Sequence, residues 1–224
     1  MNKQHELLEE LKLVFSGRVS ILDSVLPPLL FVLVNALFGL PAALWAAFGG
    51  SLIFVLLRLI RREPLKFALL GAGAAALAVG LALLLKRAQA FFLPSLVNGA
   101  LTVLVLLISL AFKRPAVAFT SYMARRWPLD WYWHARVRPA YSEVTAIWVI
   151  YSAAKLAFQY YFYQQGQAGA LAVFNLVSGW PSLIVLLVVS YLYGLKRLRQ
   201  LGGPSVEEFK NDTPPPWQGQ QRGF

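Results

Sequence analysis

Cysteine is absent from the 224 residues of this chain. Its absence excludes disulfide bonds, thiolate metal ligands and a cysteine nucleophile. The only two histidines, His5 and His134, lie outside the long apolar segments, so the sequence indicates neither a metal centre nor a pair of buried haem or chlorophyll ligands. The HExxH, GxSxG and P-loop motifs are missing too. We therefore expect a protein that is not an enzyme and that holds no metal or other cofactor.

Charged residues are also scarce, at 14% of the chain, whereas 58% of the residues are hydrophobic and the mean hydropathy is +0.58. These values are typical of a membrane protein rather than a soluble domain. The apolar residues cluster into segments long enough for an α-helix to cross a hydrocarbon core about 30 Å thick. Membrane-spanning strands would alternate apolar and polar residues, which these segments do not.

We predict an all-α bundle of six transmembrane helices, which makes residues 20–198 one transmembrane domain. Residues 1–19 mix acids and bases with leucines at helical spacing, so they indicate an amphipathic helix on the membrane surface. A cleaved signal peptide is disfavoured because Asp23 and the Pro27-Pro28 pair interrupt its apolar region. The predicted spans are residues 20–38, 41–60, 65–85, 90–112, 142–163 and 169–194.

The distribution of Lys and Arg predicts the orientation, because short loops rich in these residues stay in the cytoplasm. One side of the membrane receives three basic clusters, near residues 58–66, 113–138 and 196–199, while the other receives Lys86 and Arg87. Both termini are therefore expected in the cytoplasm, with the chain crossing the membrane several times. The net charge of +11 then points to anionic lipids as partners, and not to nucleic acid.

The fifth predicted span contains a lysine, Lys155, within the stretch YSAAKLAFQYYFY. Thirteen residues from the cytoplasmic end of the span place its Cα roughly 20 Å above the inner face. Asn98 and Asn175 on the inward-running spans fall at about the same level. An intramembrane ammonium normally faces the bundle interior or a wet cavity. We predict a polar cluster of Lys155, Gln159, Ser152, Asn98 and Asn175, with Asn35 as a further candidate. The alternative is that Lys155 snorkels outward and the amides only bridge helices.

A second polar group is expected near the cytoplasmic face, where Asp23, Arg58 and Glu143 lie at one level and can pair. Prolines near this level and in the sixth span remove helix hydrogen bonds. Pro27, Pro28 and Pro181 are therefore predicted to kink their helices and to expose carbonyl groups. Membrane helices also carry purely structural prolines, so a kink alone does not establish a function.

The longest loop, residues 115–141, interleaves aromatic rings with cations. Both kinds of side chain favour the head-group layer, so we expect a segment lying on the cytoplasmic leaflet, with a docking surface for a protein partner as the alternative. The polar, Pro-rich tail, residues 199–224, is expected to be extended or disordered beyond Gly202 unless a partner orders it. The residues singled out in the loop are Arg125, Arg126, Trp127, Trp131, Trp133, Arg136 and Arg138.

Several segments, in order, carry a family resemblance: LDSVLPPLLFVLVNALFG, LLRLIRREPLKFALLG, FFLPSLVNGAL, KRPAVAF, RPAYSEVTAIWVIY and SGWPSLIVLLVVSYL. Over about residues 18 to 195 the chain resembles a family of uncharacterised bacterial integral membrane proteins, best known from actinobacteria. That family is loosely grouped with inner-membrane proteins of the intracellular septation protein A type. The resemblance implies an inner-membrane bundle of five or six helices and assigns no activity.

Two classes of function remain. The first is a transporter or channel-like protein that moves a small solute past Lys155, with the prolines as hinges. The second is a non-catalytic scaffold or accessory subunit of an envelope or bioenergetic complex, to which residues 115–141 or the tail 203–224 would dock. The sequence chemistry favours transport, whereas the family resemblance does not decide between the two.

Overall fold

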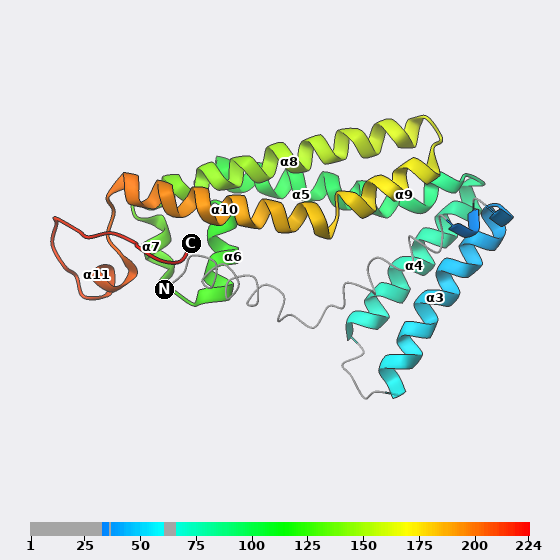
Figure 1. Cartoon of the computed structure of the whole chain (residues 1–224), viewed down its shortest axis with the longest axis horizontal. Helices are drawn as coiled ribbons and strands as arrows, with labels where there is room; N and C mark the ends of the chain where they lie inside the picture. The colour runs from blue at the N-terminus through cyan, green and yellow to red at the C-terminus, as the bar shows by residue number, and fades with distance from the viewer. Residues whose placement is uncertain (1–32, 36, 61–65) are drawn as a thin grey trace. The chain divides into compact units, whose positions relative to one another are not determined.

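The computed structural model describes residues 33–35, 37–60 and 66–224, and in this part of the chain helices are the only regular secondary structure, as the sequence predicts. The predicted surface helix 1–19 and most of the first span lie outside the described residues, as do Asp23, Pro27 and Pro28. The helices are α3 (Leu40–Ile60), α4 (Lys66–Leu85), the 3-10 helix η1 (Ala88–Phe92), α5 (Leu93–Ala111), α6 (Ala116–Arg125), α7 (Leu129–Trp133), α8 (Arg138–Gln164), α9 (Ala168–Val177), α10 (Trp180–Leu201) and α11 (Val206–Lys210) (Figure 1).

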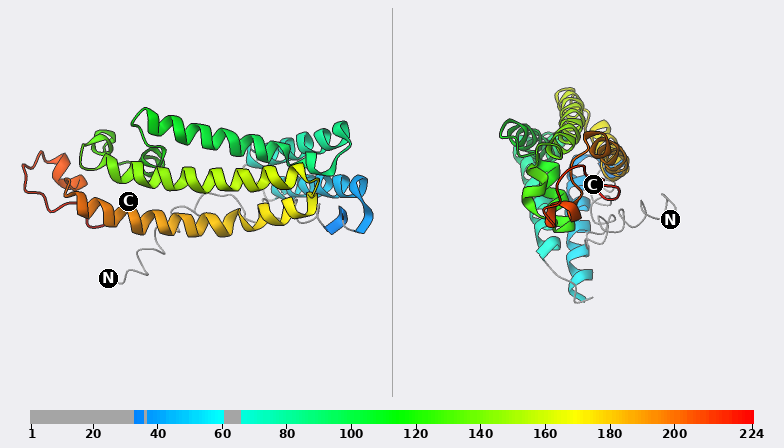
Figure 2. Two further views of the ribbon diagram at one scale, coloured as in Figure 1. Left: turned by 90° about the horizontal axis from the view of Figure 1, so that it is seen from above. Right: turned by 90° about the vertical axis from the view of Figure 1, so that its left-hand side faces the viewer.

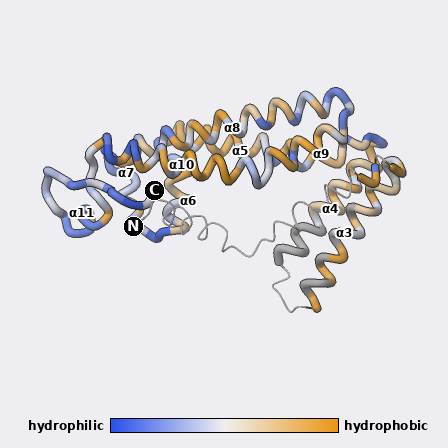
Figure 3. The backbone as a smooth tube through the Cα atoms, in the orientation of Figure 1, coloured by the Kyte–Doolittle hydropathy of each residue, from blue (hydrophilic) through white to orange (hydrophobic). Residues whose placement is uncertain are grey.

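Two of the described helical stretches, Ala88–Ala111 and Ala168–Leu201, are long and apolar enough to cross a membrane. Both appear largely orange in the hydropathy colouring of Figure 3. Little of either apolar stretch is buried within the protein, and α5 exposes bulky side chains such as Val97, Leu104 and Val105. A core helix of a soluble protein would bury such a surface. These two stretches favour a membrane location.

The chain divides into two compact units, and each is described separately. Unit 2 contains the described residues between 33 and 100 together with residues 155–182. Its core is built mainly from small residues, which let helix backbones approach closely. The buried members are Ala43, Leu44, Ala78, Ala82, Ala90, Phe91, Phe92, Leu96, Ala168, Leu171 and Ala172.

Unit 1 contains the described residues 101–154 and 183–224. Within it, α5, α8 and α10 run side by side (Figure 2). The Trp148 indole of α8 donates a hydrogen bond of 2.8 Å to Ser190 Oγ of α10, and the backbone N–H of Val117 at the start of α6 donates to Thr145 Oγ1 of α8 over 3.3 Å. These contacts fasten α6 and α10 to α8.

An aromatic cluster forms the core at one end of unit 1, and this differs from the expected membrane-facing role of the loop aromatics. Trp131 and Tyr132 are both fully buried, and their rings pack edge to face with centroids 5.1 Å apart. The Trp131 indole N–H donates to the Pro204 carbonyl over 2.9 Å. Trp131 therefore stabilises the protein interior, because the short α7 turns its ring inward and not toward a head-group layer.

The tail, expected to be extended or disordered unless a partner orders it, packs within unit 1 and contains the short helix α11. Ser205 caps α11 by accepting a hydrogen bond from the Glu208 N–H, and the Glu208 carboxylate accepts one from the Ser205 N–H. Val206 is buried in the aromatic cluster, and Phe209 and Phe224 pack against it. Three apolar side chains of the tail thus pack into the core of unit 1. The mainly polar composition of the tail does not reveal these few contacts.

Replacement of Trp131 by alanine should destabilise unit 1 strongly. The change removes a fully buried ring and the bond to Pro204, and truncation of a buried Trp typically costs about 3–5 kcal/mol. Denaturant unfolding of the purified protein in detergent measures the loss. Trp45→Ala is the matched control, since Trp45 is 68% exposed and its truncation should change stability little. Equal stability of the two variants would contradict the assignment of Trp131 to the core.

Candidate functional site

The predicted sixth span is interrupted two residues before Pro181. α9 ends at Val177 and α10 begins at Trp180, because proline lacks the N–H that a continuous helix needs and its ring clashes with the preceding turn. The Ser182 hydroxyl donates to the Val177 carbonyl over 2.9 Å and so satisfies one acceptor freed by the break. The kink predicted at Pro181 is present as this break, which Figure 1 shows between α9 and α10.

Lys155 of α8 donates a hydrogen bond to a second carbonyl group at the break. Its Nζ donates to the Ser178 carbonyl oxygen over 3.0 Å, and the residue is half-buried. Carbonyl groups at the carboxyl end of a helix carry the negative end of the helix dipole, where a cation is stabilised. The ammonium of Lys155 therefore acts as a cationic cap on α9.

One helical turn further along α8, Gln159 lies at the centre of an amide network. Its side chain is only 1% exposed. The carboxamide nitrogen donates to Ser95 Oγ of α5 over 3.1 Å and also to Asn175 Oδ1 of α9. Gln159 thereby joins three helices of unit 2 through polar contacts, which cost least when every buried donor has an acceptor.

Gly99 allows the close approach of α5 to this network. A Cβ atom there would lie 3.3 Å from Leu156 Cδ1 and 3.4 Å from Gln159 Oε1, tighter than ordinary contact. The small residue therefore makes room for the Gln159 carboxamide.

The remaining members of the predicted cluster are less closely joined. Asn98 lies on the exposed surface of α5 and Ser152 is half-buried in unit 1. Asn35 is half-buried, and its backbone carbonyl accepts a hydrogen bond from the Gly39 N–H over 3.2 Å. The structure thus brings together Gln159 and Asn175, and it joins Lys155 to α9. Sequence analysis missed Ser95 and the Ser178 carbonyl, although each lies within three residues of a proline, Pro94 or Pro181, that marks irregular backbone.

No Asp or Glu occurs among the described residues of unit 2, which are 33–35, 37–60, 66–100 and 155–182. The partner described for the Lys155 ammonium is therefore a neutral carbonyl group and not a carboxylate. In the described part of the chain, no group of three or more His, Cys, Asp or Glu side chains is arranged to hold a metal ion.

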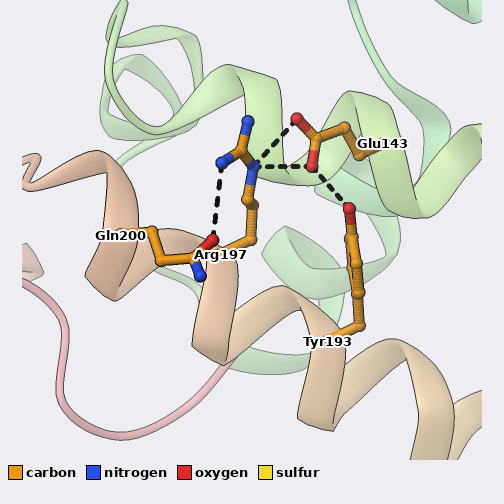
Figure 4. Close-up of polar contacts among 4 residues, drawn as sticks. All are labelled: Glu143, Tyr193, Arg197 and Gln200. Carbon is orange, nitrogen blue, oxygen red and sulfur yellow. Dashed lines mark hydrogen bonds and ion pairs between the residues drawn. The ribbon is translucent and has the colours of Figure 1, made fainter.

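Glu143 of the predicted cytoplasmic group forms an ion pair within unit 1. The Arg197 Nε–H points at both carboxylate oxygens, at 2.9 and 2.7 Å, and the Tyr193 hydroxyl donates to the same carboxylate over 2.8 Å (Figure 4). Asp23 and the Arg58 side chain lie outside the described residues. The partner described for Glu143 is thus Arg197, which joins the start of α8 to α10. Both side chains are about a third exposed, so solvent weakens the pair.

The loop cations contact the protein's own tail. Arg125 Nε donates to the Phe224 main-chain oxygen over 3.1 Å, and the guanidinium lies 4.8 Å from the centroid of Trp127. Arg136 donates to the Gly202 carbonyl over 3.4 Å and lies 5.7 Å from the centroid of Trp217. Of the other predicted loop residues, Trp133 stacks under Arg114, Arg126 adopts a left-handed conformation at the end of α6, and Arg138 is the first residue of α8.

The Phe224 ring packs against residues of both α8 and α10. It stacks on the Tyr141 ring with centroids 4.3 Å apart and planes 9° from parallel. A Cβ atom on Gly194 would overlap the Phe224 ring, so α10 needs a glycine at this contact. The structure thus supplies the tail with a partner inside its own chain.

Glu208 links the start of α11 to a later part of the tail, residues 218 and 219. Its carboxylate accepts backbone hydrogen bonds from Ser205 and Gln218, each over 2.7 Å, and from Gly219 over 3.2 Å. These donors stabilise the charged form, with Ser205 contributing most, and lower the pKa of the Glu208 carboxyl to about 2.

Comparison with known proteins gives one match. The model of a family described as "Protein of unknown function (DUF3159)" matches residues 15–200. The matched range includes the aromatic loop 115–141 and ends before residues 203–224 of the tail. No curated protein and no solved structure matches the chain.

The low pKa of Glu208 predicts how the tail responds to acid. A carboxyl group whose pKa falls on folding stabilises the fold above its unfolded value of 4.5 and loses this effect as the pH falls toward about 2. A spin label on Asp212→Cys should therefore become more mobile over this pH range. Glu208→Gln should make the label mobile even at neutral pH. Glu207→Gln is the control, because Glu207 is exposed. A label that is equally immobile in both variants would contradict the role of the Glu208 carboxylate in holding the tail together.

Proposed function

The chain belongs to DUF3159, a protein family of unknown function, and we propose that it is an integral protein of the bacterial inner membrane that carries a small solute across the bilayer. In this proposal six helices span the membrane and both termini lie in the cytoplasm. The asymmetric placement of Lys and Arg supports this orientation. The two apolar helical stretches support insertion, and the bounds of α3, α4 and α8 agree with three further predicted spans.

The observation that carries the transport proposal is the broken α9–α10 segment, in which Lys155 donates a hydrogen bond to the Ser178 carbonyl group at the break. Helices that span a membrane without interruption satisfy their own backbone groups, and non-helical backbone is tolerated there only inside protein or beside a water-filled cavity. Transporters commonly use the ends of such half-helices to bind their substrates and coupling ions. The same geometry gives this protein polar groups within its apolar segments.

The break also supplies a hinge. Residues 178 and 179 lie between two helices, and a few such residues can absorb the backbone changes of an alternating-access motion. Lys155 fastens one side of this hinge to α8. A solute that draws the ammonium away from the Ser178 carbonyl would loosen that fastening and so couple binding to movement.

The scaffold alternative rests mainly on the loop and the tail as docking segments. Their mutual contacts in unit 1, through Trp131, Arg125 and Phe224, give both segments a partner within the chain. This arrangement removes the disordered tail that favoured an external partner, and it leaves transport as the better-supported function.

Solute permeation can be tested before the solute is known. Proteoliposomes are shifted into isosmotic potassium acetate, potassium butyrate, potassium succinate or glycerol, and swelling is followed by light scattering with valinomycin present. Wild-type protein should accelerate swelling in at least one of these media. Lys155→Met should reduce the rate to that of empty liposomes, because the central polar group is lost. Lys210→Met is the matched control on the exposed tail. Full flux through the Lys155→Met variant would contradict the proposal.

A further inference from the structure

The structure describes no counter-charge for Lys155 among the residues of unit 2 that it covers. The described residues of unit 2 contain no Asp or Glu, and the acceptor described for the ammonium is the neutral Ser178 carbonyl. A charge in a low-dielectric environment is costly unless it is paired and hydrogen-bonded. A bound anion would supply the counter-charge that the described residues of this unit do not provide.

The hydrogen-bonding capacity that remains is rich in donors. An ammonium has three N–H donors, and the described contacts of Lys155 use one of them. The Asn175 carboxamide oxygen accepts from Gln159, while its amide nitrogen has no acceptor among the residues that the structure describes. Donors without acceptors favour a ligand that offers lone pairs, such as a carboxylate.

The two donor groups lie on adjacent turns of the α8–α9 pair. Lys155 lies one turn before Gln159 on α8, and Asn175 lies one turn before Ser178 on α9. The two bonds between the helices, from Lys155 to Ser178 and from Gln159 to Asn175, thus form successive rungs. Residues three or four apart on a helix are neighbours on its surface, so a ligand with two oxygen atoms can reach both rungs.

The surroundings of the rungs are apolar and aromatic. The ring of Phe174, next to Asn175, packs against Phe158 and Phe162, each with centroids 5.8 Å apart. Leu171, one turn earlier on α9, is fully buried. Such side chains suit a hydrocarbon body and offer nothing to a second charged group.

The other described cations of unit 2 with resolved side chains, Lys86 and Arg87, are exposed. With no described acid to oppose them, they give this unit a positive field that attracts anions.

From these observations we propose that the Lys155 site binds a singly charged carboxylate with an apolar body, whose oxygens accept from Lys155 Nζ and the Asn175 amide. This inference rests on the proposed function, since it names the class of solute that the transporter carries. One ammonium balances one negative charge, so dicarboxylates and phosphate should bind less well than a monocarboxylate of similar size.

Direct binding tests the inference without requiring transport. The full-length protein in lipid nanodiscs is titrated with butyrate by isothermal calorimetry, with succinate, inorganic phosphate and the neutral isostere butyramide as comparisons. Butyrate should bind, and the other three should bind about tenfold or more weakly, because each lacks either the single charge or the apolar body. No butyrate binding to the wild-type protein, or equal binding of butyramide, would overturn the proposal.

The absence of cysteine from the chain permits a matched test of the ammonium itself. Lys155→Cys should lose butyrate binding. Alkylation with 2-bromoethylamine converts the cysteine to an isostere of lysine and should restore binding. Reaction of the same sulfur with methyl methanethiosulfonate, which forms an uncharged methyl disulfide and releases methanesulfinate, should not. Recovery in the first sample also shows that the variant is folded. Butyrate binding by Lys155→Cys before any modification would overturn the proposal.

The two proposals fail separately. Butyrate binding that depends on Lys155, together with no solute permeation in proteoliposomes, would keep the carboxylate site and refute transport. Permeation of glycerol that depends on Lys155, with no butyrate binding, would keep transport and refute the carboxylate.

Discussion

The hydrogen bond from the Lys155 ammonium to the Ser178 carbonyl is the interaction on which the account of this protein depends. An ammonium within apolar helices needs acceptors, and a continuous helix has none to offer because its carbonyl groups are already bonded. Pro181 interrupts the segment and frees such groups. In the proposed transport mechanism the same break serves as the hinge, and Asn175, one turn before it, accepts a hydrogen bond from Gln159. Charge, backbone geometry and the amide network are therefore parts of one arrangement.

The surrounding helices are suited to hold this arrangement. Small residues such as Ala43, Ala82 and Ala172 fill the core of unit 2 and allow backbones to approach, so association does not depend on large side chains that lipid would solvate equally well. Gly99 applies the same device at the polar site itself. Unit 1 is built differently. Its aromatic cluster around Trp131 resembles the core of a water-soluble domain, with edge-to-face rings and a hydrogen-bonded indole.

Sequence reasoning located the elements better than their contacts. Helical rise predicts one depth for Lys155, Asn98 and Asn175, because depth depends only on counting residues along a span. The structure joins Lys155 and Asn175 to contacts between α8 and α9, whereas Asn98 is exposed on α5. The role of Ser178 could not be predicted, because the group that accepts from Lys155 is its backbone carbonyl, which no side-chain pattern reveals. The sequence predicts an interfacial role for Trp131, but the structure buries it. Composition alone does not distinguish a buried tryptophan from one at the membrane interface. The packing of the tail could not be predicted, because its few apolar residues contact helices that are distant in the sequence.

The most direct test measures the Lys155 contact in a bilayer. Protein labelled with ¹⁵Nζ-lysine and ¹³C-carbonyl serine is reconstituted into lipid, and the nitrogen–carbon dipolar coupling is measured by solid-state NMR, with the Lys155→Arg variant identifying the signal. The account predicts a coupling from Lys155 that corresponds to direct hydrogen bonding, as the nitrogen–oxygen distance of 3.0 Å requires. A Lys155 nitrogen with no coupling to a serine carbonyl, and with contacts to lipid phosphate instead, would contradict it.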